Sequence, residues 1–105
     1  MMNKERCLRL GFPEPQSFEN QTGYVLRCLL TGLLVDTRKA RFIGIYNLHS
    51  VIPKLKRRRV PFEHHHLVVQ CPESGEVSGR PVNVIYMTEK QRNEYLAHQK
   101  ERAKP

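Results

Sequence analysis

Apolar residues recur at three- and four-residue spacing in the segment that follows residue 20, which is the spacing of a helix with one buried face. The pattern predicts a helix over residues 22–31, with Thr22 as its N-cap. Gly32 stands where a helix commonly ends, because glycine adopts a left-handed conformation at little cost. The apolar stripe of this helix is Val25, Leu26, Cys28, Leu29, Leu30 and Leu33.

A short second helix is predicted directly afterwards. Asp36 or Thr37 is expected to cap it, and an aspartate at that end also suits the helix dipole. Ala40 and Ile43 are expected to face inward, and Gly44 is expected to end the helix in a tight turn.

A third helix is predicted over residues 47–58. Its inward edge consists of Leu48, Ile52 and Leu55. Proline removes a helical hydrogen bond and clashes with the preceding turn, so Pro53 implies that the helix either begins near Ser50 or is kinked. The opposite edge carries Tyr46, Asn47, His49, Ser50, Lys54, Arg57 and Arg58.

Two strands are predicted over residues 62–70 and 80–87, which are rich in Val, Ile, Phe and Tyr. Period-two alternation puts Val82, Val84 and Tyr86 on one face, and likewise Leu67 and Val69. The segment CPESGEVSG between the strands is a turn-former. We therefore predict an antiparallel hairpin with a long tip.

A capping box, Thr88-x-x-Gln91, follows the second strand and predicts a polar helix over residues 89–102. Its clearly apolar residues are Tyr95, Leu96 and Ala97. Because this stripe is thin, it is expected either to pack on the domain or to pair with a second copy of the chain.

The chain divides into three parts. Residues 1–20 are polar and are expected to form an extended N-terminal arm, in which Leu8, Leu10 and Phe12 are available to dock. Residues 21–87 are expected to form the domain, and residues 88–105 the C-terminal helix.

Residues 38–59 carry the entire charge imbalance of the chain. They contain eight Lys or Arg and no Asp or Glu, whereas the remainder holds ten of each sign. The net charge of +8 is therefore concentrated on a segment that also shows helical spacing. A localised positive field on a folded element is typical of proteins that bind polyphosphates.

The order of the predicted elements indicates an α+β fold, a winged helix-turn-helix of three helices and a β-hairpin wing, with a C-terminal helix. The outer edge of the third helix is then free to enter the major groove of DNA. Asn47, His49 and Ser50 are predicted to contact base edges. Phosphate contacts are predicted for Arg38, Lys54, Arg57, Arg58 and Arg80, and Lys39 and Tyr46 complete the predicted interface.

The run LLTGLLVDTRKARFIGIYNLHSVIPKLKRRRVPFE, followed by a strand that ends in VIYM, resembles small winged helix-turn-helix proteins of bacteriophages and mobile elements. The resemblance covers roughly residues 24–87 and implies DNA binding in the regulation or replication of a mobile element. Pro53 and Arg59 depart from the pattern, since the family often has glycine at the second position. The matching positions are Leu29, Leu30, Gly32, Ala40, Gly44, Ile45, Leu48, Ile52, Leu55, Phe62 and Tyr86.

Other chemistry was weighed against DNA binding. His64 and His66 alternate on a predicted strand and, with Cys71, suggest a metal site, but no fourth ligand has suitable spacing. The favoured interpretation is that His64, His65 and His66 are ordinary strand residues that bind no metal. The same histidines and Tyr95 remotely resemble those of rolling-circle nucleases, but His65 breaks their His-hydrophobic-His pattern. No Ser/His/Asp set or phosphate-cradling glycine loop is visible, so a protein without enzymatic activity, metal or cofactor is expected.

The expected partner is duplex DNA, and RNA or a protein partner is the alternative for the same fold. The longest apolar run, residues 24–35, is interrupted by Arg27 and is too short to span a bilayer. The first residues lack the pattern of a signal peptide, and the three cysteines are scattered, so a cytoplasmic location without membrane contact is expected. Tyr95 and Leu96 suggest a homodimer formed through the C-terminal helix.

Overall fold

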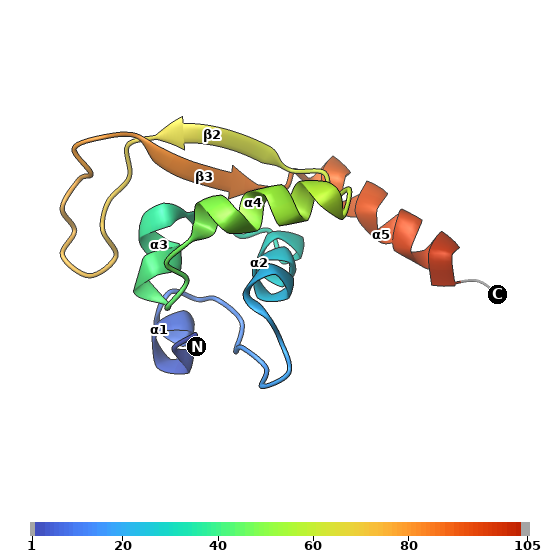
Figure 1. Cartoon of the computed structure of the whole chain (residues 1–105), viewed down its shortest axis with the longest axis horizontal. Helices are drawn as coiled ribbons and strands as arrows, with labels where there is room; N and C mark the ends of the chain where they lie inside the picture. The colour runs from blue at the N-terminus through green and yellow to red at the C-terminus, as the bar shows by residue number, and fades with distance from the viewer. Residues whose placement is uncertain (1, 104–105) are drawn as a thin grey trace.

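The structure of the protein is a computed structural model that describes residues 2–103, with the side chains of residues 2–100. Within this range the chain folds as an α+β protein, in which helices pack beside a three-stranded antiparallel sheet (Figure 1). The elements in chain order are α1 (Lys4–Arg9), α2 (Gln21–Leu30), β1 (Val35–Asp36), α3 (Thr37–Phe42), α4 (Leu48–Arg57), β2 (Glu63–Leu67), β3 (Val82–Tyr86) and α5 (Glu89–Ala103).

The sheet has the strand order β1, β3, β2, and both pairs are antiparallel. The β2–β3 hairpin is confirmed, although both strands are shorter than predicted. Strand β1 was not predicted, because two residues are too few to show alternation. Val35 lies opposite Ile85, and Asp36 lies opposite Val84. This pairing ties the start of α3 to the central strand.

The structure decides which face of β3 meets the core, a point that the predicted alternation left open. Ile85 and Met87 belong to the core cluster, so the alternating set that begins at Val82 points to the opposite face. Val84 is nevertheless buried, whereas Leu67, opposite Val82 on β2, is half exposed. Strand β3 carries apolar residues on both faces, and the sequence pattern therefore could not identify the face that meets the core.

Helices α1 to α4 end in the same hydrogen-bonding arrangement. At the end of α2 the amide of Leu33 donates to the carbonyl of Cys28 over 3.1 Å, and after α4 the amide of Val60 donates to that of Leu55 over 3.1 Å. Such a bond requires a left-handed residue directly after the helix. The left-handed residues are Gly11, Gly32, Gly44 and Arg59, with φ of 77°, 86°, 105° and 58°. The predicted helix ends at Gly32 and Gly44 are confirmed.

The N-cap of α2 is Asn20, and the predicted cap, Thr22, is wrong. Asn20 Oδ1 accepts a hydrogen bond of 2.7 Å from the amide of Gly23, and Thr22 is buried in the first turn. Asparagine and threonine both cap helices well, so the residue types alone could not decide between them. Helix α3 is capped by Asp36, whose Oδ1 accepts from the amide of Lys39 over 2.8 Å. This confirms one of the two predicted alternatives, and the predicted inward residues Ala40 and Ile43 are buried.

The N-terminal segment is not an extended arm, because residues 4–9 form α1. Phe12, one of the predicted docking residues, is buried in the core, and so is Cys7. The hydroxyl of Tyr24 on α2 donates to the carbonyl of Pro13 over 2.6 Å, which fastens the segment to the domain. A helix of six residues shows too little periodicity to be recognised from sequence.

Helix α4 spans Leu48–Arg57, which confirms the helix predicted over residues 47–58. It continues through Pro53, so the first of the two alternatives for this proline, a start near Ser50, is excluded. Pro53 has no amide hydrogen to donate to the carbonyl of His49. Both residues are exposed, and water therefore has access to the carbonyl that loses its helical partner.

The capping box of α5 is confirmed. The hydroxyl of Thr88 accepts from the amide of Gln91 over 3.1 Å, and the side-chain oxygen of Gln91 accepts from the amide of Thr88 over 2.9 Å. Helix α5 extends away from the body of the protein (Figure 1). Tyr95 packs against the core cluster, whereas Leu96 is 48% exposed. Within residues 2–103, every helix is too short or too polar to cross a lipid bilayer.

Candidate nucleic-acid interface

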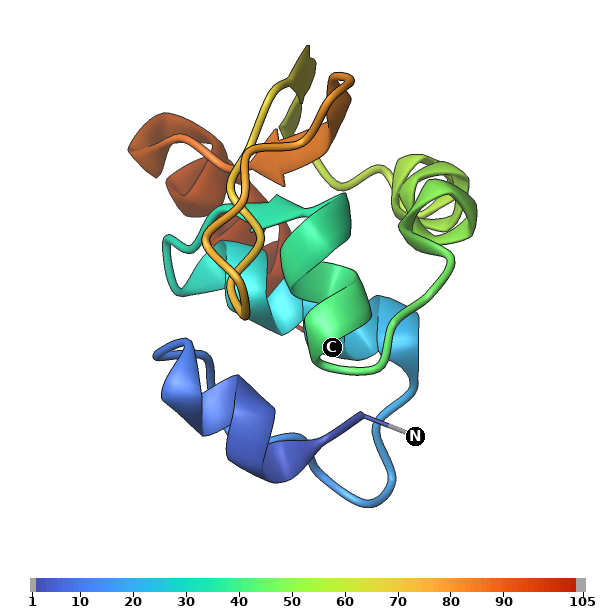
Figure 2. The same cartoon turned by 90° about the vertical axis from the view of Figure 1, so that its left-hand side faces the viewer.

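Helix α4 lies at one side of the molecule and packs against α2 and α3; Figure 2 looks nearly along its axis. Four of its side chains are buried at that contact: Leu48, Val51, Ile52 and Leu55. The predicted inward edge is confirmed, and Val51 widens it. Because these residues share one face, His49, Ser50 and Arg57 lie on the other and are exposed.

The residues that were predicted to contact DNA lie in three places. Those on α4 or directly beside it are all exposed, and they are Tyr46, Asn47, His49, Ser50, Lys54, Arg57 and Arg58. Arg38 and Lys39 lie in the first turn of α3 and are half-buried. Arg80 is exposed and precedes β3 by two residues. The structure therefore brings most of the predicted residues together around one helix.

The basic side chains around α4 have no acidic partner among the side chains of residues 2–100. The ion pairs in this part of the chain are Lys4–Glu14, Arg9–Glu5 and Arg27–Glu19, at 3.0, 3.4 and 2.7 Å. None of them involves a residue of the segment 38–59. The positive charge of that segment is therefore not neutralised by the protein itself.

An open pocket of about 510 Å³ lies between the first turn of α2 and the exposed side of α4. No carboxylate lines it. The lining includes Gln21 and Thr22 of α2 and Asn47, Ser50, Lys54 and Arg58 of the α4 side. Neither residue of α2 was assigned to an interface from the sequence, where Thr22 was considered only as an N-cap, because no local pattern reveals which helix start will lie beside α4.

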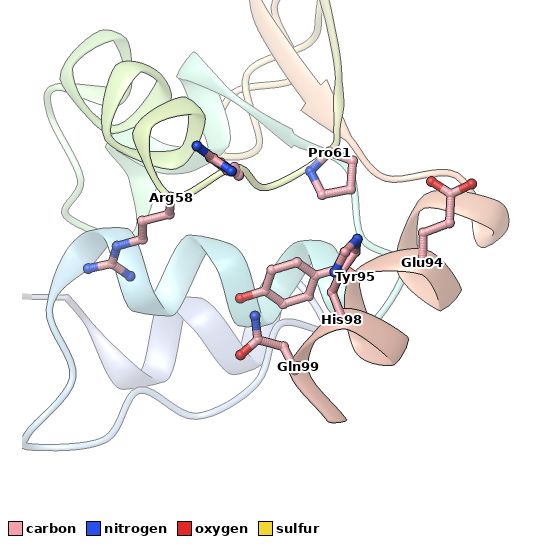
Figure 3. A pocket seen from close by; sticks show the side chains of 7 residues that line it. Arg58, Pro61, Glu94, Tyr95, His98 and Gln99 are labelled. Atoms are coloured by element: carbon pink, nitrogen blue, oxygen red, sulfur yellow. The ribbon is translucent and has the colours of Figure 1, made fainter. Parts of the chain in front are cut away.

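A second pocket, of about 300 Å³, lies between the end of α4 and α5 (Figure 3). In Figure 3, Tyr95 extends from α5 towards the end of α4, whereas the side chain of Arg58 turns away from it. Glu94 also lines this pocket, so its charge is mixed. Arg58 lines both pockets, and the cationic end of α4 therefore connects them.

The loop between β2 and β3, residues 68–81, is held by its own hydrogen bonds. Gln70 and Val77 form an isolated bridge, and the amide of Cys71 donates to the carbonyl of Glu76 over 2.7 Å. The hydroxyl of the buried Ser78 accepts from the amide of Val69 over 3.1 Å. The long tip predicted from Pro, Ser and Gly is thus structured, and Arg80 follows it next to the paired strands.

The histidines of β2 make contacts typical of strand residues. His64 Nε2 lies 2.9 Å from Asn83 Oδ1, and the rings of His64 and His66 are 5.1 Å apart on one face. On the other face, His65 stacks on Tyr86 at 5.8 Å. Among residues 2–103, no three or more His, Cys, Asp or Glu side chains are arranged to hold a metal ion. The metal site suggested for His64, His66 and Cys71 therefore has no structural support.

The cysteines fall into two classes. Cys7 and Cys28 are buried, and burial raises the pKa of Cys28 to about 12 and also raises the pKa of Cys7. Both thiols are protonated at neutral pH and serve as small core residues. Cys71 lies in the loop between β2 and β3, where hydrogen bonds from the Ser74 amide and hydroxyl lower the pKa of its thiol.

Comparison of the chain with protein-family models, with curated proteins and with solved structures finds no match. The resemblance to winged helix-turn-helix proteins of bacteriophages and mobile elements therefore remains a prediction from the sequence.

Proposed function

We propose that this protein is a winged helix-turn-helix protein that binds double-stranded DNA. The observation that carries the proposal is the exposed face of α4, which is basic and has no acidic partner among residues 2–103. A helix fits the major groove of B-form DNA, and unpaired cations along it attract phosphates.

The order of the elements supports the proposal. Helices α2, α3 and α4 are followed by the β2–β3 hairpin, as in a helix-turn-helix with a wing. The core residues of α4 fix its orientation against α2 and α3, so the polar face is presented as a rigid surface. A preorganised surface loses less conformational entropy on binding than a flexible one.

The residues of α4 divide by length and charge. Asn47, His49 and Ser50 are short and polar, and we assign them to base edges. Lys54, Arg57 and Arg58 are long and charged, and we assign them to phosphates or to guanine. Flanking contacts are assigned to Arg38, Lys39, Tyr46 and Arg80. Binding of this kind requires no cofactor.

Salt dependence tests the proposal. If about five phosphates are neutralised, the logarithm of the association constant falls against the logarithm of the salt concentration with a slope of about −4 to −5. Fluorescence anisotropy of a labelled duplex, titrated over a range of potassium chloride concentrations, measures that slope. An affinity that does not change with salt contradicts the proposal.

Competition at one salt concentration distinguishes duplex DNA from the alternative partners. We expect unlabelled duplex DNA to displace the probe better than structured RNA or an acidic protein does. Selection from random duplexes then identifies the target sequence. The role we propose is that of a cytoplasmic regulator or accessory factor of a phage or mobile element.

A further inference from the structure

The start of α2 presents free hydrogen-bond donors to the pocket beside α4. The first amides of a helix have no helical acceptor. In α2 the Asn20 side chain satisfies the amide of Gly23, but the amides of Gln21 and Thr22 donate to no acceptor within residues 2–103. Gln21 and Thr22 both line the pocket.

The hydroxyl of Thr22 adds an independent signal. This residue is only 4% exposed, yet its side chain makes no hydrogen bond with any residue of the described range 2–103. Among the described residues, every fully buried side-chain nitrogen or oxygen has a hydrogen-bond partner, so the hydroxyl oxygen of Thr22 keeps some solvent exposure although the rest of the residue is buried. Because Thr22 lines the pocket, a ligand there can accept its hydrogen bond.

Positive charge lies on the opposite wall. Lys54 and Arg58 are four residues apart on α4, so they occupy one side of the helix. Asn47 and Ser50 add polar groups, and no carboxylate lines the pocket. Amide donors, a hydroxyl and two cations around one opening match a tetrahedral oxyanion with several oxygen acceptors.

We propose that this pocket holds one phosphate of the DNA backbone, next to the groove that α4 enters. The inference rests on the proposed function. A backbone phosphodiester is favoured over a free phosphate because the pocket is open and continuous with the exposed side of α4, where a strand can pass. The contact anchors α2 as well as α4, and two anchored helices fix the angle of α4 in the groove.

The substitution Thr22→Val tests the pocket, because it removes the hydroxyl and leaves volume and charge almost unchanged. We expect duplex affinity to fall about tenfold at every salt concentration, with an unchanged salt slope. Thr22→Ser, which keeps the hydroxyl, should retain the affinity of the unmodified protein. Lys54→Gln should reduce the slope by about one, whereas Lys90→Gln on α5 should not change it.

A double variant shows whether the two residues hold the same phosphate. Thr22→Val combined with Lys54→Gln should weaken binding by less than the product of the single effects, because both substitutions act on one contact. Far-UV circular dichroism verifies the fold of each variant. Amide shifts of Gln21 and Thr22 in the unmodified protein, titrated with duplex, give the same information if Thr22→Val does not fold.

The outcomes separate this inference from the proposed function. Salt-dependent duplex binding that is unaffected by Thr22→Val, or additive effects in the double variant, would exclude a phosphate from the pocket and leave DNA binding intact. If the protein binds no duplex, the proposed function and the backbone assignment both fail. Titration with inorganic phosphate then decides the source: shifts of the two amides would assign the pocket to a free phosphate, and their absence would eliminate the site.

Discussion

Charged side chains in residues 4–27 and in residues 38–59 are in opposite situations. In the first region Lys4, Arg9 and Arg27 pair with glutamates, and Arg6 donates to the carbonyl of Phe42 over 3.1 Å. In the second region, none of the eight basic side chains donates a hydrogen bond to another of residues 2–103. The same residue types therefore hold the fold together in one region, whereas in the other they have no partner among the described side chains.

The difference has an energetic reason. Like charges that are close in sequence repel one another, and no acidic residue within 38–59 offsets that repulsion. A bound polyanion removes the repulsion and releases counterions. Under the proposed function, these side chains therefore contribute to binding rather than to the stability of the fold.

The largest effect on duplex affinity is expected from reversing charges in residues 38–59. Lys54→Glu with Arg57→Glu should weaken duplex binding at least about a hundredfold and lower the salt slope by at least about two. The fold should persist, because both side chains are exposed. Fluorescence anisotropy at several salt concentrations measures both quantities.

The matched control is Lys4→Glu with Arg9→Glu, which reverses two exposed cations of the first region. We expect affinity to change less than about threefold, because the net charge falls equally but the residues lie away from α4. Equal losses in both variants would mean that net charge alone, without a defined interface, produces binding.

A smaller effect is expected from the ion pair of the first region. Arg27 donates to both oxygens of Glu19, over 2.9 and 2.7 Å, and this lowers the pKa of the Glu19 carboxyl group. A lowered pKa in the folded state means that the carboxylate stabilises the fold above about pH 4.5, and that this contribution is lost as the pH falls. Glu19→Gln should therefore lower the free energy of unfolding by about 1 kcal/mol at neutral pH.

Urea unfolding of the unmodified protein and of Glu19→Gln, at neutral pH and at about pH 3, measures this loss of unfolding free energy at each pH. The loss should be much smaller at the acidic pH, where the carboxyl group of the unmodified protein is itself becoming protonated. An equal loss of unfolding free energy at both pH values would show that Glu19 acts through packing and not through charge. Duplex affinity should not change.

Substitutions at the left-handed residues that follow α2 and α4, Gly32 and Arg59, should change the free energy of unfolding by a similar amount. Arg59 adopts φ of 58°, which costs an arginine about 1 kcal/mol, whereas Gly32 adopts φ of 86° without that cost. Arg59→Gly should raise the free energy of unfolding by about 0.5–1 kcal/mol and lower duplex affinity a few-fold, because a cation is lost. A stability gain without any loss of affinity would show that the charge of Arg59 does not contribute to binding.

The matched substitution is Gly32→Ala. An added methyl group would meet only the Arg92 guanidinium, 3.6 Å away, so its cost is conformational. We expect Gly32→Ala to lower the free energy of unfolding by about 1 kcal/mol, measured by urea unfolding.

The smallest effect on stability is expected from Leu96→Ser on α5. Leu96 is 48% exposed, so its replacement should change the free energy of unfolding by no more than about 0.5 kcal/mol. If α5 forms a homodimer, as we propose from the sequence, sedimentation velocity should show a dimer for the unmodified protein and a monomer for the variant. A monomer in both cases contradicts the dimer.

Much of the helical framework was predictable because its signals are local. Gly32 and Gly44 end helices, Asp36 caps α3, and Thr88 and Gln91 form the capping box of α5. Each of these depends on residues within one turn of one another. The inward edge of α4 follows in the same way from the three- and four-residue spacing of its apolar side chains.

The failures have equally definite causes. Strand β1 and helix α1 are too short to show a period, and β3 is apolar on both faces. The N-cap of α2 lay two residues earlier than predicted because asparagine and threonine are both suitable there. Gln21 and Thr22 line the candidate phosphate pocket, but the sequence could not assign them to it, since no local pattern indicates that the start of α2 packs beside α4.

The sequence by itself determined where the charge is concentrated, that helices α2 to α5 form and which edge of α4 is apolar, because these depend on composition and on neighbours along the chain. Only the tertiary structure decided which cations meet carboxylates and which face solvent, that residues 4–12 dock on the domain, and that the start of α2 lies beside Lys54 and Arg58. The physical reason is that those contacts join residues that are distant in sequence, and their existence depends on how the whole core packs.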